Sequence, residues 1–400
     1  MPKETPSSTD ASQLPSSDSS KALVDRINAY HYSLLTKAVA GVGADAADAR
    51  KGVVCSSFSV CHAVGLVLAG LDDQEGAFSS DRTITNSSYN RDLIPILRSV
   101  AHPSPSTTIA VASSVWIRST ISIPQSFSTK ITSMAGSVNA VPNLSAEAIN
   151  SWISETTKGQ IGPMVGKDVE REDCALVSAV YFKSSWKTKF RVRTNDPLEF
   201  HTMDGTTKPL ERMTCTTKYL VGDDGAGGTA VSVPFADGQC VARFIMAAEP
   251  PSVDGNKDPL TYVDIMRLCA ENTRSVPNML NVALVLPRKI NLTSSVNLLK
   301  VWKDSDVEGS TTDTSGISFA SLTKPMRFLG ETYRISQAVH AARLSMDENG
   351  AEAAAATVIV NTRSMVRPAS VVFDRPFLVE IVHSESNVIT FLGLFTGGTD

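Results

Sequence analysis

Four consecutive alanines, residues 353–356, stand between a charged stretch and the strand-forming run Thr-Val-Ile-Val in the segment DENGAEAAAATVIVNTRSM, residues 347–365. In an extended chain, alternate side chains point to opposite faces. One row of side chains is then small near Gly350 and larger further on, as suits a strand that fits between existing strands; it comprises Ala351, Ala353, Ala355, Thr357 and Ile359. The other row contains Glu352, the only charge between Gly350 and Asn361, so this row must face water.

The alanines leave two interpretations of this segment open. Alanine is a weak strand former and a strong helix former, so an ordinary alanine-rich helix fits the composition. A flexible segment that later enters a sheet also fits, because small side chains would not overpack the sheet. In that case the insertable part should end where the small row becomes polar and charged, at Asn361 and Arg363.

The composition of the whole chain is that of a globular protein. Of its 400 residues, 42% are hydrophobic and 20% are charged, and the net charge is −4. No bulk positive field would therefore attract nucleic acid or anionic lipid. The longest apolar run, residues 60–71, is too short to span a bilayer. We expect neither a nucleic-acid partner nor a membrane partner.

The first residues, MPKETPSSTDASQLPSSDSS, are rich in serine and proline and contain almost no apolar side chain. We expect a disordered tail over residues 1–21 and a single domain over residues 22–400. No signal peptide is evident, because the hydrophobic core of such a signal is missing. The expected location is the cytoplasm, or outside the cell after leaderless export; secretion with a leader that was trimmed from this sequence is the alternative.

Hydrophobic periodicity predicts helices mostly in the first part of the chain and strands mostly in the last. Apolar residues recur at helical spacing over 22–40, 58–71 and 145–158. Strands are predicted over 174–182 and 280–286 and in three pieces near the C-terminus, SVVF, FLVEIVH and NVITFLGLF. The glycine cluster at 222–228 predicts a hairpin turn. This order favours an α+β fold with antiparallel sheets.

No motif of an enzyme or of a cofactor site is present. The sequence lacks a nucleophile elbow, a zinc-protease motif and a phosphate-binding loop. Its six cysteines are scattered without metal-ligand spacing, and most lie in apolar surroundings, so we expect buried free thiols. The prediction is a protein that is not an enzyme and has no metal or other cofactor.

Five ordered segments, together with the general pattern of residues 22–397, resemble the serpin family. Glu348, Gly350, Glu352 and the alanines before Thr357 are similar to the hinge of its reactive-centre loop. The other four segments are VCSSFS (54–59, with Ser57 in place of the usual proline), AEAINSWISETTKGQIGPMV (146–165), LVSAVYFKSSWKTKF (176–190) and VFDRPFLVEIVHSESNVITFLGLF (372–395).

The resemblance implies a metastable serpin fold with three β-sheets, about eight or nine helices and an exposed reactive-centre loop at about residues 348–368. It also implies a monomeric suicide inhibitor of serine proteases. The target would attack the loop and form the acyl-enzyme of its own mechanism, and the cleaved loop would enter the central sheet as a new strand. A non-inhibitory carrier, chaperone or storage protein with the same fold is the alternative.

The family's usual hinge length, counted from Gly350, places the bond that the protease cuts between Ser364 and Met365. That position suits elastase-like or subtilisin-like targets. Arg363 stands one residue earlier and would suit a trypsin-like pocket with a buried carboxylate, and some relatives have a loop one residue shorter. Both bonds remain open, with a slight preference for Arg363–Ser364.

The resemblance also assigns roles to individual residues. The hinge comprises Glu348, Gly350, Ala351, Glu352, Ala353, Ala354, Ala355, Ala356 and Thr357. Ser56, Ser59, Ser178 and His340 correspond to the shutter, a buried polar cluster under the strands that must part, and Trp186 corresponds to the breach, where the loop first enters. Because Ser178 replaces the usual asparagine, the shutter should have fewer hydrogen bonds or an additional water. Activation by heparin is not expected, since Arg82, Arg91 and Arg98 are too sparse to form a basic stripe.

Overall fold

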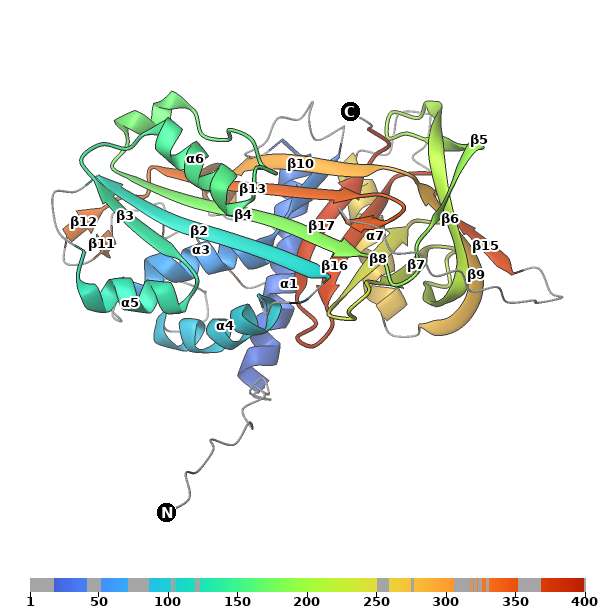
Figure 1. Ribbon diagram of the computed structural model, residues 1–400, viewed down its shortest axis with the longest axis horizontal. Helices are drawn as coiled ribbons and strands as arrows, with labels where there is room; N and C mark the ends of the chain where they lie inside the picture. Colours follow the sequence, from blue (N-terminus) through green and yellow to red (C-terminus); the bar gives the residue numbers. More distant parts are fainter. Residues whose placement is uncertain are drawn as a thin grey trace, which may run out of the picture.

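The computed structural model describes residues 18–41, 52–70, 86–101, 104, 106–118, 123–249, 259–274, 277–305, 317, 319, 322, 326–328, 331–351 and 368–398. Within these residues the chain forms seven α-helices, one short 3-10 helix and three β-sheets. Figure 1 shows their arrangement.

A six-stranded sheet runs along the long axis of the molecule (Figure 1). Its order is β10 (Ile290–Asn297), β13 (Gln337–Met346), β4 (Cys174–Ser185), β2 (Thr107–Arg118) and β3 (Ser137–Val141), with the short β14 (Gly350–Ala351) beside β4. Strand β4 is apolar over most of its length and almost entirely buried, as expected of a strand that is covered on both faces.

A nine-stranded sheet occupies the other end of the molecule (Figure 1). Its order is β1 (Val53–Cys55), β17 (Ile389–Phe395), β16 (Phe377–His383), β8 (Cys240–Met246), β7 (Thr229–Pro234), β6 (Thr207–Asp223), β9 (Asn278–Pro287) and β15 (Ala369–Val372), with β5 (Arg191–His201) also paired to β6. A separate hairpin joins β11 (Met326–Phe328) to β12 (Glu331–Tyr333).

Helices cover both faces of the six-stranded sheet. Helix α3 (Ser57–Ala69) packs against β2 and β4 on one face. Helix α6 (Ala146–Thr156) packs on the other face, where Ile149 and Ile153 meet the apolar side chains of β4. The remaining helices are α1 (Asp18–Val39), α4 (Asn86–Val100), α5 (Gln125–Ser133), η1 (Lys167–Arg171), α7 (Pro259–Arg274) and α8 (Leu298–Ser305).

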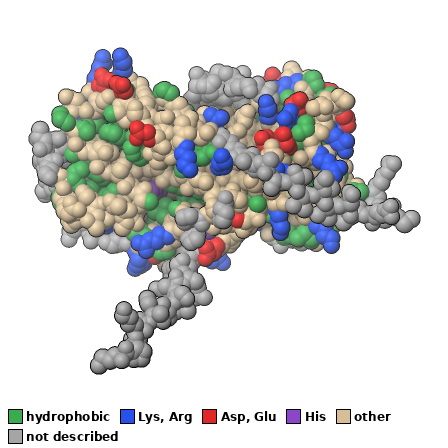
Figure 2. Space-filling model, viewed as in Figure 1, with side chains coloured by type: hydrophobic (Ala, Val, Ile, Leu, Met, Phe, Trp, Pro, Cys, Tyr) green, Lys and Arg blue, Asp and Glu red, His purple; other side chains and the backbone are tan. Residues whose placement is uncertain are grey.

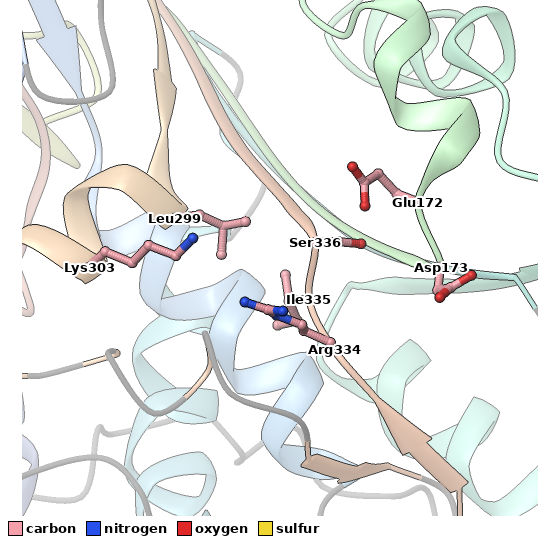
Figure 3. Close-up of a pocket in the computed structure, with 7 residues that line it drawn as sticks. All are labelled: Glu172, Asp173, Leu299, Lys303, Arg334, Ile335 and Ser336. Atoms are coloured by element: carbon pink, nitrogen blue, oxygen red, sulfur yellow. The ribbon is translucent and has the colours of Figure 1, made fainter.

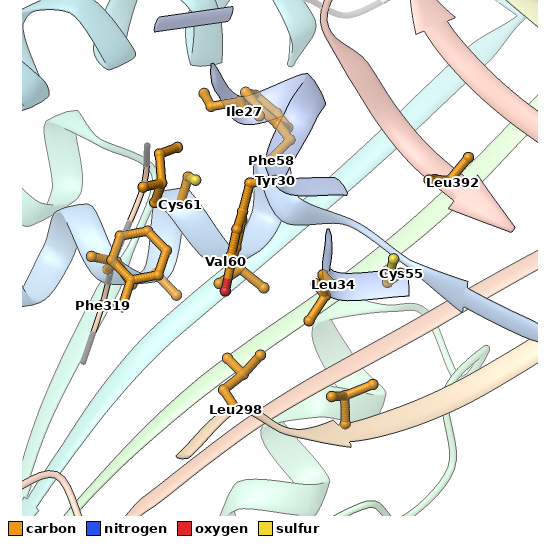
Figure 4. Close-up of a cluster of buried hydrophobic side chains, with 14 of the residues drawn as sticks. Ile27, Tyr30, Leu34, Cys55, Phe58, Val60, Cys61, Leu298, Phe319 and Leu392 are labelled. Carbon is orange, nitrogen blue, oxygen red and sulfur yellow. The ribbon is translucent and has the colours of Figure 1, made fainter. Parts of the chain in front are cut away.

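The largest hydrophobic cluster lies where α1 and α3 meet the sheets. Ile27 and Leu34 of α1, Phe58 of α3 and Leu392 of β17 are all fully buried there (Figure 4). Helix α3 is buried from Ser57 to Leu68, which agrees with its uninterrupted apolar sequence. Each such side chain contributes about 1.5–3 kcal/mol by leaving water, so α3 is a fixed support for the strands above it.

Most elements predicted from periodicity are confirmed. The three predicted helices correspond to α1, α3 and α6, and the predicted strands correspond to β4, β9, β15, β16 and β17. The glycine cluster connects β6 to β7 as a hairpin, in which the Asp224 amide donates to the Gly228 carbonyl at 3.2 Å. The α+β class is therefore confirmed.

The expected boundary of the N-terminal tail is corrected at its end. Helix α1 begins at Asp18, so residues 18–21 belong to a helix and not to a disordered segment that reaches residue 21. Asp18 places a negative charge in the first turn, where it interacts favourably with the helix dipole. Periodicity missed this turn because it contains no large apolar side chain. Residues 1–17 lie outside the described residues.

The surface combines charges of both signs. On the face seen in Figure 2, basic and acidic side chains are interspersed over the molecule. Arg91 of α4 forms an ion pair with Asp92 at 3.1 Å. In the part of the chain that the structure describes, no helix has both the length and the hydrophobicity that a membrane span requires.

Candidate functional site

The central feature of the site is the boundary between β4 and β13. These two strands are parallel neighbours over Gln337–Arg343, which face Ala175–Tyr181. At the carboxyl end of β4 a different strand takes over, because Gly350 pairs with Ser185 and Ala351 pairs with Ser184 in antiparallel orientation. Strands β4 and β13 are thus paired directly along most of β4, and we call the boundary between them the seam. The chain that leaves β13 turns back toward the seam at the carboxyl end of β4.

The turn that brings the chain back is built from residues 347–350. The Asp347 amide donates to the Gly350 carbonyl at 2.9 Å, and the Asp347 carboxylate accepts from the Asn349 amide at 2.7 Å. Gly350 has φ +141°, and a Cβ atom there would lie 2.2 Å from the carbonyl oxygen of Ser184. Only glycine fits this backbone without strain and allows such a close approach to β4.

Trp186, which sequence reasoning places at the breach, lies directly against this turn. Its indole donates to the Asp347 carbonyl at 2.8 Å, and its amide donates to the Asn349 carbonyl at 2.9 Å. The ring stacks on Phe235, with ring centroids 4.5 Å apart. The buried tryptophan therefore holds the start of the hinge through two hydrogen bonds.

An ion pair that sequence reasoning missed also holds the hinge. Nε and Nη2, which form one edge of the Arg288 guanidinium, donate to the two carboxylate oxygens of Glu348 at 3.1 and 3.3 Å, and Nη1 donates to Glu211 at 2.9 Å. Partial burial would raise the pKa of Glu348, but the hydrogen bonds from Arg288 bring that pKa below its ordinary value. Arg288 directly follows Pro287 at the end of a predicted strand, but nothing local links it to Glu348.

The four residues assigned to the shutter are brought together under the seam, and all are fully buried. The Ser59 and Ser178 hydroxyls lie 2.8 Å apart, and the Ser178 hydroxyl lies 3.1 Å from Nδ1 of His340. Nε2 of His340 accepts from the Ser56 amide at 2.9 Å. A neutral ring that accepts at Nε2 carries its proton on Nδ1, so His340 donates to Ser178 across the boundary between β13 and β4.

Three neighbours extend this cluster beyond the sequence prediction. Nε2 of His31, on α1, accepts from the Ser57 amide at 2.7 Å. The hydroxyls of Ser57 and of Ser113, which faces Ser178 across β2 and β4, are buried without a hydrogen-bond partner in the described structure. Two buried hydroxyls beside the cluster thus have spare hydrogen-bonding capacity, and the effect of serine at position 178 stays a prediction.

Burial keeps both histidines of the cluster neutral. Burial lowers the pKa of His340 to about 3. Burial lowers the pKa of His31 to about 3 as well, with a further contribution from the nearby His340. A protonated ring would point an N–H at the amide N–H that it now accepts from, so the observed hydrogen bonds require the neutral form.

The remaining predicted residues of the hinge and of the reactive bond lie on either side of the last described residue of β14, Ala351. Ala351 is fully buried, as expected for the row of small side chains. Glu352, Ala353, Ala354, Ala355, Ala356 and Thr357 of the hinge lie outside the described residues, as do Arg363, Ser364 and Met365 of the reactive bond. Their roles stay predictions.

The six cysteines are all buried and none forms a disulfide bond, as the sequence predicts. Burial raises the pKa of the Cys174 and Cys240 thiols to about 12, so these groups are weak nucleophiles. Among the described residues, no group of histidine, cysteine and carboxylate side chains could hold a metal ion.

The model of the family described as serpin (serine protease inhibitor) matches residues 43–397. This chain belongs to the serpin family. An alpha-1-antitrypsin homolog of Cyprinus carpio is 30% identical over 260 residues, which are 65% of this serpin and 66% of the carp protein. Ovalbumin of Dromaius novaehollandiae is 26% identical over 324 residues, which are 77% of this chain and 79% of ovalbumin.

Solved structures show the same fold. Human thyroxine-binding globulin in complex with its ligand superposes with a TM-score of 0.74 at 17% identity, over 96% of this serpin and 100% of that chain. The thermophilic serpin tengpin, in the native state, superposes with a TM-score of 0.73 at 18% identity, over 94% of both chains.

Proposed function

We propose that this serpin traps serine proteases covalently, through cleavage of the loop after Gly350 and insertion of that loop between β4 and β13. The observation that carries the proposal is the pairing of β14. Gly350 and Ala351 are antiparallel to β4 at its carboxyl end, while β4 and β13 remain directly paired below. An inserted strand would continue the ladder of β14 in the same direction.

The chemistry belongs to the attacking protease. Its serine oxygen adds to the carbonyl carbon of Arg363 or Ser364, and the peptide bond breaks. The amine of the next residue leaves with the proton of the serine hydroxyl, and the loop is left as an acyl ester on the protease. The serpin contributes the strand that then moves, because cleavage releases the loop from its attachment to β15.

Insertion requires β4 and β13 to separate. Their parallel ladder between Ala175–Tyr181 and Gln337–Arg343 must open, and the contact from His340 to Ser178 crosses the same boundary. Buried polar groups need partners, so the serine and histidine cluster provides a barrier that the entering strand replaces with its own hydrogen bonds. The small row at Ala351, Ala353 and Ala355 lowers the steric cost of entry.

The serpin family also contains non-inhibitory members, such as ovalbumin and thyroxine-binding globulin. For this chain the small hinge residues support inhibition, because a bulky or charged residue in the inward-facing row would slow insertion. A carrier or storage function does not require this row.

The test is to mix the protein with trypsin and, separately, with elastase, and to look for complexes that survive SDS. Mass spectrometry of the released C-terminal peptide shows which bond is cut. A peptide that begins at Ser364 assigns the Arg363–Ser364 bond, which we favour for trypsin-like targets. A peptide that begins at Met365 assigns the Ser364–Met365 bond, which suits elastase-like targets.

Arg363→Ala separates the two assignments further. The variant should lose most of its trypsin complex and keep its elastase complex. A trypsin complex that forms at the full rate would show that the arginine assignment is wrong. The absence of any SDS-stable complex with either protease, accompanied by simple cleavage, would favour a non-inhibitory function.

A further inference from the structure

A pocket of about 340 Å³, drawn in Figure 3, is lined by residues that directly precede β4 and β13, and it therefore lies at the opposite end of these strands from the hinge. Its lining residues are Glu172, Asp173, Leu299, Lys303, Arg334, Ile335 and Ser336. We refer to these residues as the foot pocket. The acidic side chains come from the segment that leads into β4, whereas the basic ones come from α8 and from the segment that leads into β13 (Figure 3).

The foot pocket contains charges of both signs that do not neutralise one another. Within the described structure, Glu172, Lys303 and Arg334 form no ion pair, and Asp173 pairs only weakly with Arg118 at 3.8 Å. Leu299 and Ile335 form a buried apolar floor between them. A ligand that carries one positive and one negative group would complement this lining.

The pocket lies on the path of the inserted strand. Parallel strands begin at the same edge of a sheet, and Cys174 of β4 and Gln337 of β13 both begin beside the pocket. There the Ser336 amide donates to the Cys174 carbonyl at 3.1 Å. A strand that enters at Ser184 and runs antiparallel to β4 must leave the sheet at this edge.

The register of β14 fixes which residue arrives there. Ala351 lies opposite Ser184, and in an antiparallel pair each step forward along one strand is a step back along the other. The twelve steps from Ala351 to Arg363 lead from Ser184 back to Glu172. One residue beyond the Ile117–Cys174 pair, the Arg118 amide donates to the Asp173 carbonyl at 2.7 Å, so the pairing of β4 with β2 reaches Asp173. The next residue, Glu172, has an extended backbone with φ −95° and ψ 159°.

The two side chains would also share a face. Cys174 and Leu176 of β4 face the large core cluster, and Glu172 precedes them in the same row. Residues directly opposite each other in an antiparallel pair point to the same side. Arg363, the first charged residue in the row that begins with Ala351, would therefore lie opposite the carboxylate of Glu172.

We propose that the foot pocket binds the new chain end that cleavage of the Arg363–Ser364 bond creates. This proposal rests on the proposed function. Hydrolysis adds one water across the bond, so that Arg363 gains a carboxylate and Ser364 gains an amino group. The guanidinium of Arg363 pairs with Glu172, and its carboxylate pairs with Lys303 and Arg334. Cleavage after Ser364 would place the carboxylate about 3.3 Å further out and weaken its contacts with the pocket.

The test compares the gain in stability on cleavage between variants. Intact protein and trypsin-cleaved protein, freed of complex by chromatography, are unfolded by heat in a fixed concentration of urea, which does not screen charges. Glu172→Gln and the double variant Lys303→Gln/Arg334→Gln should keep the midpoint of the intact protein. Each should reduce the rise on cleavage by about 1–3 °C, because each removes one end of a partly exposed ion pair.

Matched controls lie beside the pocket but outside it. Glu170→Gln and Lys300→Gln remove exposed charges of the same types from η1 and α8 and should leave the rise unchanged. A rise equal to that of the parent protein in both pocket variants would overturn the proposal. A parent protein with no rise at all would show that insertion itself fails, and the SDS-stable complex tests that step independently.

Discussion

His340 connects β13 to β4, the two strands that the proposed insertion would separate, and its protonation state follows from its contacts. Its Nε2 accepts from the Ser56 amide, and its Nδ1 faces the Ser178 hydroxyl. Both contacts require a neutral ring, which a folded-state pKa of about 3 provides over the physiological range. A single residue thus joins α3, β4 and β13 through hydrogen bonds that an increase in acidity would break.

This arrangement predicts that acid destabilises the protein through the shutter. The pKa of His340 is about 3 in the folded protein and about 6.5 when unfolded, so unfolding takes up a proton between these values. The stabilisation from a neutral His340 is complete above about pH 6.5 and is lost progressively as pH falls toward 3. His340→Gln should therefore give a shallower fall of the urea midpoint between pH 6.5 and pH 4. Parallel pH profiles for the variant and the parent would contradict this assignment.

Gly350 is the second residue whose role can be isolated. Gly350→Ala should destabilise the intact protein by about 1–3 kcal/mol, because the residue has φ +141° and its new Cβ would meet the Ser184 carbonyl. Gly238→Ala is the matched control, since Gly238 also has positive φ but no heavy atom within 4 Å of the added carbon. Urea unfolding should show a larger loss at position 350. Equal losses would mean that contact with β4 contributes nothing.

At the scale of elements, the short strand β14 lies where an inserted strand would enter the sheet. Of the described residues that follow β13, Gly350 and Ala351 pair with β4, and seven positions of β13 pair directly with β4 further along. Trp186 and Arg288 fix the hinge at its start through hydrogen bonds from the end of β4 and from beyond β9. Whether the cleaved loop can extend β14 into a full strand between β4 and β13 depends on the side chains that follow Ala351.

The alternation of side chains predicts which hinge substitutions matter. Ala353→Glu and Ala355→Arg place a charge in the inward-facing row and should convert the inhibitor into a substrate without unfolding the protein. Ala354→Glu, in the row that contains Glu352, should leave inhibition nearly intact. The measurement is the number of serpin molecules consumed for each protease molecule inhibited, which should rise severalfold only for the first two variants. Inhibition at the parent stoichiometry by both would exclude the hinge assignment.

At the scale of the whole molecule, the loop is long enough to carry its end from one pole to the other. The 17 residues from Glu348 to Ser364 reach about 55 Å when extended, similar to the diameter of about 55 Å of a compact chain of this length. The seam of the six-stranded sheet provides the path, and the foot pocket lies at its far end.

Cleavage should therefore make the protein more stable. An inserted strand adds backbone hydrogen bonds on both sides and buries the row of small side chains, and each net bond contributes about 0.5–1.5 kcal/mol. We expect the thermal midpoint to rise by roughly 10 °C or more after complete cleavage of the loop. Differential scanning calorimetry of intact and cleaved protein measures this rise. An unchanged midpoint would exclude insertion and favour the non-inhibitory alternative.

The sequence by itself determined the class of the fold and most of its elements, and it predicts the position of the hinge. Periodicity reports which side of an element is buried, so α1, α3, α6, β4, β9 and the C-terminal strands followed from local patterns. The residues of the shutter and Trp186 followed from the family resemblance, and the structure brings the shutter residues together.

Only the tertiary structure decided which distant residues meet. Glu348 with Arg288, His31 with the Ser57 amide, and the charges of the foot pocket come from segments far apart in the chain. The register from which we infer that Arg363 would reach Glu172 likewise comes from the pairing of β14 with β4. No local pattern contains these contacts, because a side chain's neighbours across a sheet depend on strand order and register, which are fixed by the packing of the whole core.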